Sequence, residues 1–148
     1  NILITDPKKR FQTKMGFINF DKLNIYTNEI IEKFNVKTTS PSALASSLSG
    51  GNLQKFVVGR EIGQKPLLFI VNQPTWGVDA LSAANIRQAI VEIAKTGAAI
   101  ILISQDLDEL LEISTKLAFL TNGSLSVPTN TADIKTDEIG AIMGGVSD

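Results

Sequence analysis

Apolar residues recur every three or four positions in two stretches of the chain, which predicts two amphipathic helices. The first covers 22–34, with Asp21 as its expected N-cap. The second covers 81–95, with Asp79 as its N-cap and Gly97 just past its end. Each helix is expected to pack its apolar face against the rest of the fold.

Two short runs of continuous apolar residues flank the second helix and predict strands. Leu67–Val71 is bounded by prolines, which suits a strand buried on both faces of a parallel sheet, and Ala98–Ser104 is the next strand. Strand, helix and strand at these lengths form a βαβ unit, whose ligands bind at the carboxyl ends of the strands. Asn72, Gln73 and Gln105 follow those ends. The pattern predicts an α/β fold, a mostly parallel sheet with flanking helices.

The rest of the chain gives weaker signals. A short helix is expected over 106–114, and 116–127 reads as two strands joined at Asn122-Gly123, a strong hairpin signal. A last helix is expected over 136–143. Residues 1–20 lack a clear period and predict a loop whose aromatic side chains pack back on the fold. Those aromatic residues are Phe11, Phe17 and Phe20.

A serine and two glycines open a further predicted helix, which ends at Ile62. We expect Ser49 to cap the free N–H groups at this helix start, while Gly50 and Gly51 let the backbone approach a ligand closely. Free N–H groups and the helix dipole favour an anion such as phosphate. Helices that start after glycine turns are common, so the motif alone does not identify a site.

Composition narrows the chemistry. The 148 residues contain no cysteine and no histidine, which excludes disulfides, thiol nucleophiles and most zinc sites. The 14 basic and 15 acidic residues nearly balance, so there is no general basic field of the kind that binds nucleic acid. No apolar stretch approaches the roughly 20 residues of a membrane span. The chain begins without a methionine, and we expect it to be a fragment.

The order of the motifs is more specific than any one of them. Leu48–Asn52 reads LSGGN, the first strand ends in Asn-Gln-Pro-Thr, Gly77–Asp79 reads GVD, and the second strand ends in Ser-Gln-Asp. This set resembles the C-terminal half of the ATPase domain of ABC transporters, over nearly the whole chain. In that family LSGGQ is the signature, the first strand carries Walker B, GVD is the D-loop and the second strand leads to a switch histidine.

The resemblance implies a P-loop NTPase fold of the ABC ATPase type. Residues 1–62 would be part of the helical subdomain with the signature helix, and 63–148 the C-terminal part of the α/β core. No G-x-x-x-x-G-K-[ST] phosphate loop occurs. The groups that grip the β- and γ-phosphates would therefore lie N-terminal to Asn1 or be absent.

The resemblance also marks a degenerate catalytic site. Asn72 stands where the family has the Walker B aspartate, Gln73 where it has the catalytic glutamate, and Gln105 where it has the switch histidine. An amide cannot accept a proton at neutral pH and neutralises no charge near a metal. We therefore expect no intact catalytic residue and no metal ligand, so that ATP and Mg²⁺ would be bound together with the missing part and a partner domain.

The signature is retained apart from its last residue. In ABC ATPases two domains pair head to tail, and the signature of one closes over the nucleotide of the other. The resemblance therefore implies that Ser49, Gly50, Gly51 and Asn52 contact the γ-phosphate of ATP in trans, and that Asp79 bridges to the partner domain. The D-loop residue Trp76 is either an exposed ring at that interface or a packed one.

LSGGN with a Gln-Lys pair after the next residue, Leu53, together with PTWGVD, resembles the second ATPase domain of tandem bacterial importers of simple sugars and nucleosides. The Gln-Pro pair leans towards nucleosides. This implies a peripheral protein on the cytoplasmic face of the bacterial inner membrane, with a second ATPase domain and permease subunits as partners and a solute-binding protein as an indirect one. Two alternatives are a non-hydrolysing regulatory or protein-interaction module and an ATPase that acts on nucleic acid. The retained signature argues against the first, and the mild acidity and missing coiled coil argue against the second.

Overall fold

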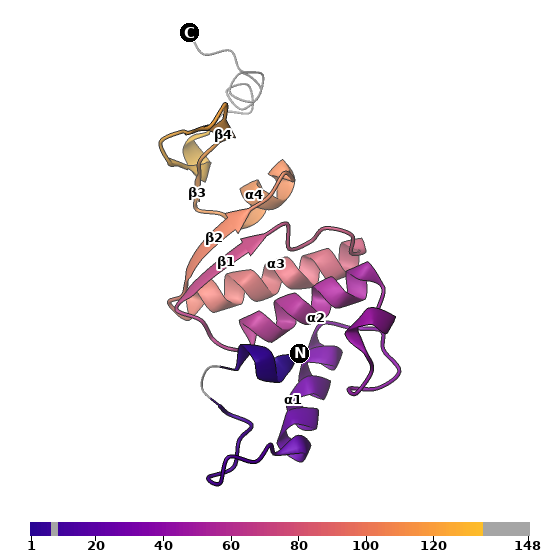
Figure 1. The fold of residues 1–148 in the computed structure, drawn as a ribbon. Coiled ribbons are helices and arrows are strands. Elements are labelled where there is room, and N and C mark those ends of the chain that lie inside the picture. The colour runs from indigo at the N-terminus through magenta and orange to yellow at the C-terminus, as the bar shows by residue number, and fades with distance from the viewer. Residues whose placement is uncertain (7–8, 135–148) are drawn as a thin grey trace. The chain divides into compact units, whose positions relative to one another are not determined.

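The computed structural model describes residues 1–6 and 9–134, which form two compact units, 1–103 and the part of the chain from 104 on (Figure 1). The tail helix expected over 136–143 lies outside the described residues. In the first unit the main elements are α1 (Phe20–Lys33), α2 (Gly50–Ile62), β1 (Leu68–Asn72), α3 (Ala80–Lys95) and β2 (Ala99–Ile103). Within 1–6 and 9–134, no helix has both the length and the apolar character needed to cross a membrane.

The strands β1 and β2 pair in parallel, with α3 as the connection between them. Leu68 lies opposite Ala99 and Asn72 opposite Ile103, so both strands end at the same edge. Gly97 takes a φ of +97° just past the end of α3, a backbone conformation that glycine adopts readily. The predicted βαβ unit and α/β fold are confirmed.

One face of this sheet is buried and the other is not. Phe69 and Val71 of β1 are buried, whereas Leu68 and Ile70 are 52% and 60% exposed. The expectation that β1 is buried on both faces is therefore wrong for this chain. Figure 1 shows α3 and α2 together on one side of the strands, and in the described residues of this unit no other element covers the opposite side.

The helix α1 packs against α2 at a glycine. A Cβ atom built on Gly59 would lie 2.5 Å from the ring of Phe34, so the absent side chain allows the close approach. The N-cap of α1 is Asn19, whose side chain accepts a hydrogen bond from the Lys22 N–H at 2.9 Å. The predicted N-cap, Asp21, instead lies in the first turn, where its negative charge favours the helix dipole.

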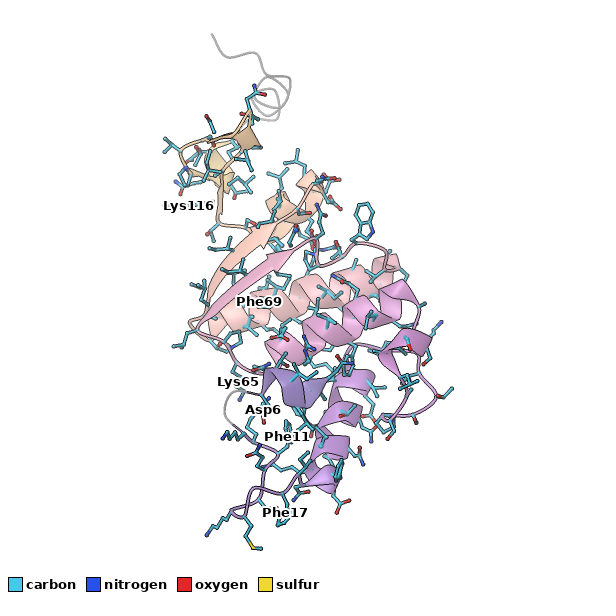
Figure 2. The ribbon with its side chains drawn as sticks, viewed as in Figure 1. Asp6, Phe11, Phe17, Lys65, Phe69 and Lys116 are labelled. Carbon is cyan, nitrogen blue, oxygen red and sulfur yellow. The ribbon has the colours of Figure 1, made fainter. Side chains whose placement is uncertain are left out.

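The loop that precedes α1 folds back only at its base. Phe11 is buried, and the Arg10 guanidinium lies 5.3 Å from its ring centroid and 4.9 Å from that of Tyr26. Phe17 and Phe20 are 68% and 63% exposed, and Phe17 lies near the tip of the loop (Figure 2). The prediction that these aromatic residues pack back is therefore wrong for two of the three. Phe17 closes a turn whose Thr13 N–H donates to its carbonyl oxygen, and Phe20 is the exposed first residue of α1.

In the second unit, α4 (Leu107–Ile113) begins at Asp106, whose side chain accepts a hydrogen bond from the Glu109 N–H at 3.1 Å. The strands β4 (Leu120–Thr121) and β5 (Ser124–Leu125) pair antiparallel. Asn122 and Gly123 between them both have positive φ, which confirms the predicted hairpin turn. The short strands β3 (Lys116–Leu117) and β6 (Thr129–Asn130) form a separate antiparallel pair that the sequence did not indicate.

Candidate functional site

The N-terminus of α2 is open. Ser49 occupies the N-cap position, but its hydroxyl makes no capping hydrogen bond. The expectation that Ser49 caps the helix is therefore wrong, and the first N–H groups of α2 keep their ability to donate. Gly50 has open space around it, since a Cβ atom there would meet nothing within 4 Å. Free donors and an unshielded backbone fit the oxygen atoms of a phosphate.

The Ser49 hydroxyl has another partner. The side-chain amide of Asn52 donates to Ser49 Oγ at 2.9 Å, and Asn52 Oδ1 accepts from the backbone N–H of Lys37 at 2.8 Å. Ser49 and Lys37 are exposed. Asn52 therefore links the signature serine to the segment that follows α1.

A cavity of about 550 Å³ lies in front of this helix start. Its lining comes from Lys37, the first turns of α2, and the loop 76–79. The helix and the loop meet closely, because a Cβ atom on Gly51 would lie 2.6 Å from the carbonyl oxygen of Gly77. Trp76 on the rim is 70% exposed, so in this chain it is not a packing residue. The structure thus brings the signature residues and the D-loop together around one cavity.

Asp79, at the end of this loop, has a structural role in the chain. Its Oδ1 accepts from the Ser82 N–H at 2.9 Å and its Oδ2 from the Ser82 hydroxyl at 2.7 Å. Asp79 is therefore the N-cap of α3, as predicted. The hydrogen bond from the Ser82 side chain, followed by that from its backbone, holds the pKa of the Asp79 carboxyl below its usual 3.8.

The end of β1 offers amides only. Gln73 follows β1 with a φ of +49°, and its N–H donates to the carbonyl oxygen of Ile103 at 2.8 Å. Asn72 beside it is exposed. Neither carries charge, and 1–6 and 9–134 hold no cluster of three or more acidic side chains placed to share a metal ion. These residues do not fit a magnesium site.

Gln105, the third position where the sequence predicts a degenerate catalytic residue, belongs to the second unit. It is exposed and lies between β2 and α4. The next residue is fixed locally, since the Asp106 N–H donates to Ser104 Oγ at 3.0 Å.

Two residues at the site were not predicted from the sequence. Gln54 donates its side-chain amide to the carbonyl oxygens of Gln73 and Pro74, both at 3.2 Å. Lys55 is only 4% exposed, and its ammonium donates to the Asn35 carbonyl oxygen at 2.8 Å. The sequence shows a Gln-Lys pair after LSGGN, but nothing in the pattern says that these polar side chains turn inward.

Curated relatives match nearly the whole chain. A nucleoside import ATP-binding protein of Lactococcus lactis is 34% identical over 145 residues, 98% of this chain and 29% of that protein. A galactose/methyl galactoside import ATP-binding protein of Pasteurella multocida is 36% identical over 94% of this chain and 27% of that protein. A guanosine import ATP-binding protein of Bacillus subtilis is 30% identical over 98% and 28%. The chain spans less than a third of the length of these relatives.

Solved structures show the same fold. A dimeric ATP-binding cassette in a post-hydrolysis state with ADP and Pi superposes with a TM-score of 0.68 at 17% identity, over 78% of this chain and 50% of that chain. An inward-facing transporter described as metal-chelate type gives a TM-score of 0.71 at 16% identity, over 97% and 56%. No protein-family model matches the chain.

Proposed function

This chain is homologous to part of the sugar and nucleoside import ATP-binding proteins of ABC transporters and has their fold, and we propose that it supplies the LSGGN signature to ATP held by a partner ATPase domain. In this proposal the chain contributes to a composite ATP site without holding the nucleotide itself.

The open start of α2 carries the proposal. Ser49, Gly50 and Gly51 line an open cavity, and the Ser49 side chain makes no capping hydrogen bond, so the first N–H groups of α2 and the Ser49 hydroxyl are available as donors. These donors would contact the γ-phosphate of ATP when the partner domain closes on the cavity. ATP with Mg²⁺ would arrive on the partner, because the described residues of this chain include no group of three or more acidic side chains that could hold the metal ion. The bound nucleotide would supply the phosphoanhydride that is hydrolysed.

The amide-only strand end supports an asymmetric role. Phosphoryl transfer needs a metal ion and a group that orients the attacking water. Asn72 and Gln73 carry no charge that would hold the metal ion, and although their amides can hydrogen-bond a water molecule they cannot accept its proton. A domain with an open signature and such a strand end is suited to complete the active site of a partner rather than its own.

The relatives indicate the setting. Proteins named for nucleosides, guanosine and galactosides match at similar identity, so the proposal covers importers of both solute classes. The remaining partners would be permease subunits in the membrane, with a solute-binding protein acting through them. The protein that contains this chain would lie at the cytoplasmic face of the membrane as a peripheral subunit.

Two substitutions in the complete ATP-binding protein, assembled with its membrane subunits, test the proposal. Ser49→Arg puts a bulky cation into the cavity and should abolish solute-stimulated phosphate release. Gln73→Ala removes one amide from a strand end without carboxylates and should lower the rate by less than about tenfold. Similar losses from both variants would mean that the amide-lined strand end is catalytic. An active Ser49→Arg variant would mean that the signature is not used.

A further inference from the structure

The Asn52 side chain has one possible orientation. A backbone N–H can only donate, so the atom that faces the Lys37 N–H at 2.8 Å must be the carbonyl oxygen of Asn52. The NH₂ group then points the other way, to Ser49 Oγ at 2.9 Å. The Asn52 amide is therefore the donor and the Ser49 oxygen the acceptor.

This polarity decides what the Ser49 hydroxyl can do. A hydroxyl has one proton to donate and two lone pairs that accept. Asn52 occupies a lone pair, and among the described residues the Ser49 hydroxyl donates to no acceptor. The proton of Ser49 stays available for an acceptor in the cavity that its residue lines.

The segment that holds Asn52 is itself fixed to α2. The ammonium of the buried Lys55 donates to the carbonyl oxygen of Asn35 at 2.8 Å, and Asn35 has a φ of +48°. Positions 52 and 55 are neighbours on one face of the helix. Residues 35–37 are thus bound to α2 at two points, and the Lys37 N–H that orients Asn52 has a fixed direction.

We propose that Asn52 is a positioning residue, which presents the Ser49 hydroxyl as a hydrogen-bond donor to a phosphoryl oxygen of the nucleotide on the partner domain. This inference rests on the proposed function of the signature. It assigns to the last residue of LSGGN an action through Ser49, set by residues 35–37 outside the motif.

Substitutions at position 52 separate this role from a structural one. Asn52→Ala removes both hydrogen bonds. Asn52→Asp keeps the acceptor for the Lys37 N–H, but its second oxygen accepts the Ser49 proton and turns the hydroxyl away from the cavity. If Asn52 only tied residues 35–37 to α2, the aspartate variant would behave like the wild type. The positioning role predicts that both variants lose activity.

The decisive experiment is a double-mutant cycle in the complete ATP-binding protein with its membrane subunits, read as solute-stimulated phosphate release against ATP concentration. We expect Asn52→Ala and Ser49→Ala each to lower kcat/KM by about tenfold or more, and the double variant to match Ser49→Ala within about twofold. The same cycle with Asn52→Asp measures the effect of the aspartate charge by itself. With Ser49→Ala there is no hydroxyl to turn away, so any further loss in the Asn52→Asp double variant comes from the charge. Melting temperatures show whether each variant is folded.

The outcomes distinguish the two proposals. The role of Asn52 would be overturned by wild-type activity of Asn52→Ala or Asn52→Asp. It would also be overturned if the losses of the two single alanine variants multiplied in the double variant. In either case an inactive Ser49→Arg variant would still support the proposed function of the signature. Full activity of Ser49→Arg would overturn the proposed function and this inference together.

Discussion

Gln54 of the signature helix donates its side-chain amide to the backbone carbonyl oxygen of Gln73, 3.2 Å away in the turn after β1. The same nitrogen lies 3.2 Å from the carbonyl oxygen of Pro74. The helix that we propose contacts ATP is thereby attached to the turn that follows β1. Any displacement of that turn would act directly on the signature helix.

Removal of this contact should destabilise the chain. Gln54→Ala leaves two carbonyl oxygens without their donor and should lower the free energy of unfolding by about 1–2 kcal/mol, measured by urea denaturation. Gln54→Glu should be at least as destabilising, because a carboxylate would face two carbonyl oxygens. Gln88→Ala on the exposed face of α3 is the matched control, with an expected change within about 0.5 kcal/mol. Equal effects at positions 54 and 88 would contradict the structural role of Gln54.

The two signature glycines should respond differently to alanine. Gly51→Ala brings a methyl group against the Gly77 carbonyl and should cost about 1–3 kcal/mol of stability, because a backbone atom cannot rotate away. Gly50→Ala meets open space and should leave the melting temperature unchanged or slightly raised. In the assembly of the proposed function, both variants should reduce phosphate release. The methyl group at position 50 would shield the backbone from the nucleotide, and the one at position 51 would displace the loop at Gly77. A destabilised Gly50→Ala variant would contradict the open helix start.

The Asp79 cap of α3 predicts that the stability of the fold depends on pH in the acidic range. The pKa of Asp79 lies below its usual 3.8 in the folded chain, so its charged form stabilises the fold above that value. The stabilisation should fade as the pH falls from about 3.8 through the lower folded pKa. Asp79→Ala should therefore reduce the melting temperature at pH 7 and flatten its dependence on pH below 4. If the melting temperatures of the wild type and the variant fell equally with pH across this range, the role of the Asp79 charge in the cap would be contradicted.

The isolated chain should neither hydrolyse ATP nor bind it tightly. An open helix start offers a few N–H donors and a dipole interaction of about 1 kcal/mol, far less than a phosphate loop with a metal ion provides. Isothermal titration of the purified chain with MgATP measures this. A micromolar dissociation constant, or phosphate release above a buffer blank, would show that the chain holds a complete site of its own.

Local signals predicted the fold well where one residue determines the geometry. The Asp79 cap and the Asn122-Gly123 turn depend on the chemistry of the residue at that position, and both were found as expected. The burial of β1 was not predictable in the same way. A continuous apolar sequence indicates that a strand can be covered on both faces. Whether a second covering element is present depends on other parts of a fold.

The details of the site depended on competition between partners that the sequence does not rank. The Ser49 hydroxyl accepts from the Asn52 amide and not from a backbone N–H of α2, and the Asn52 amide is in turn held by the Lys37 N–H. The inward direction of Lys55 follows from the carbonyl oxygen of Asn35, twenty positions earlier in the sequence. Such non-local backbone acceptors leave no periodic signal.

The uncovered face of the β1–β2 sheet has a consequence for the life of the polypeptide in the cell. Ile70, Ile101 and Ile103 all keep about half or more of their surface in contact with solvent. Short apolar strands in this state are the segments that chaperones bind and that proteolytic quality control selects. Expressed by itself, the chain should associate with chaperones or be degraded. Its steady-state level should rise when it is expressed as part of the longer ATP-binding protein proposed above.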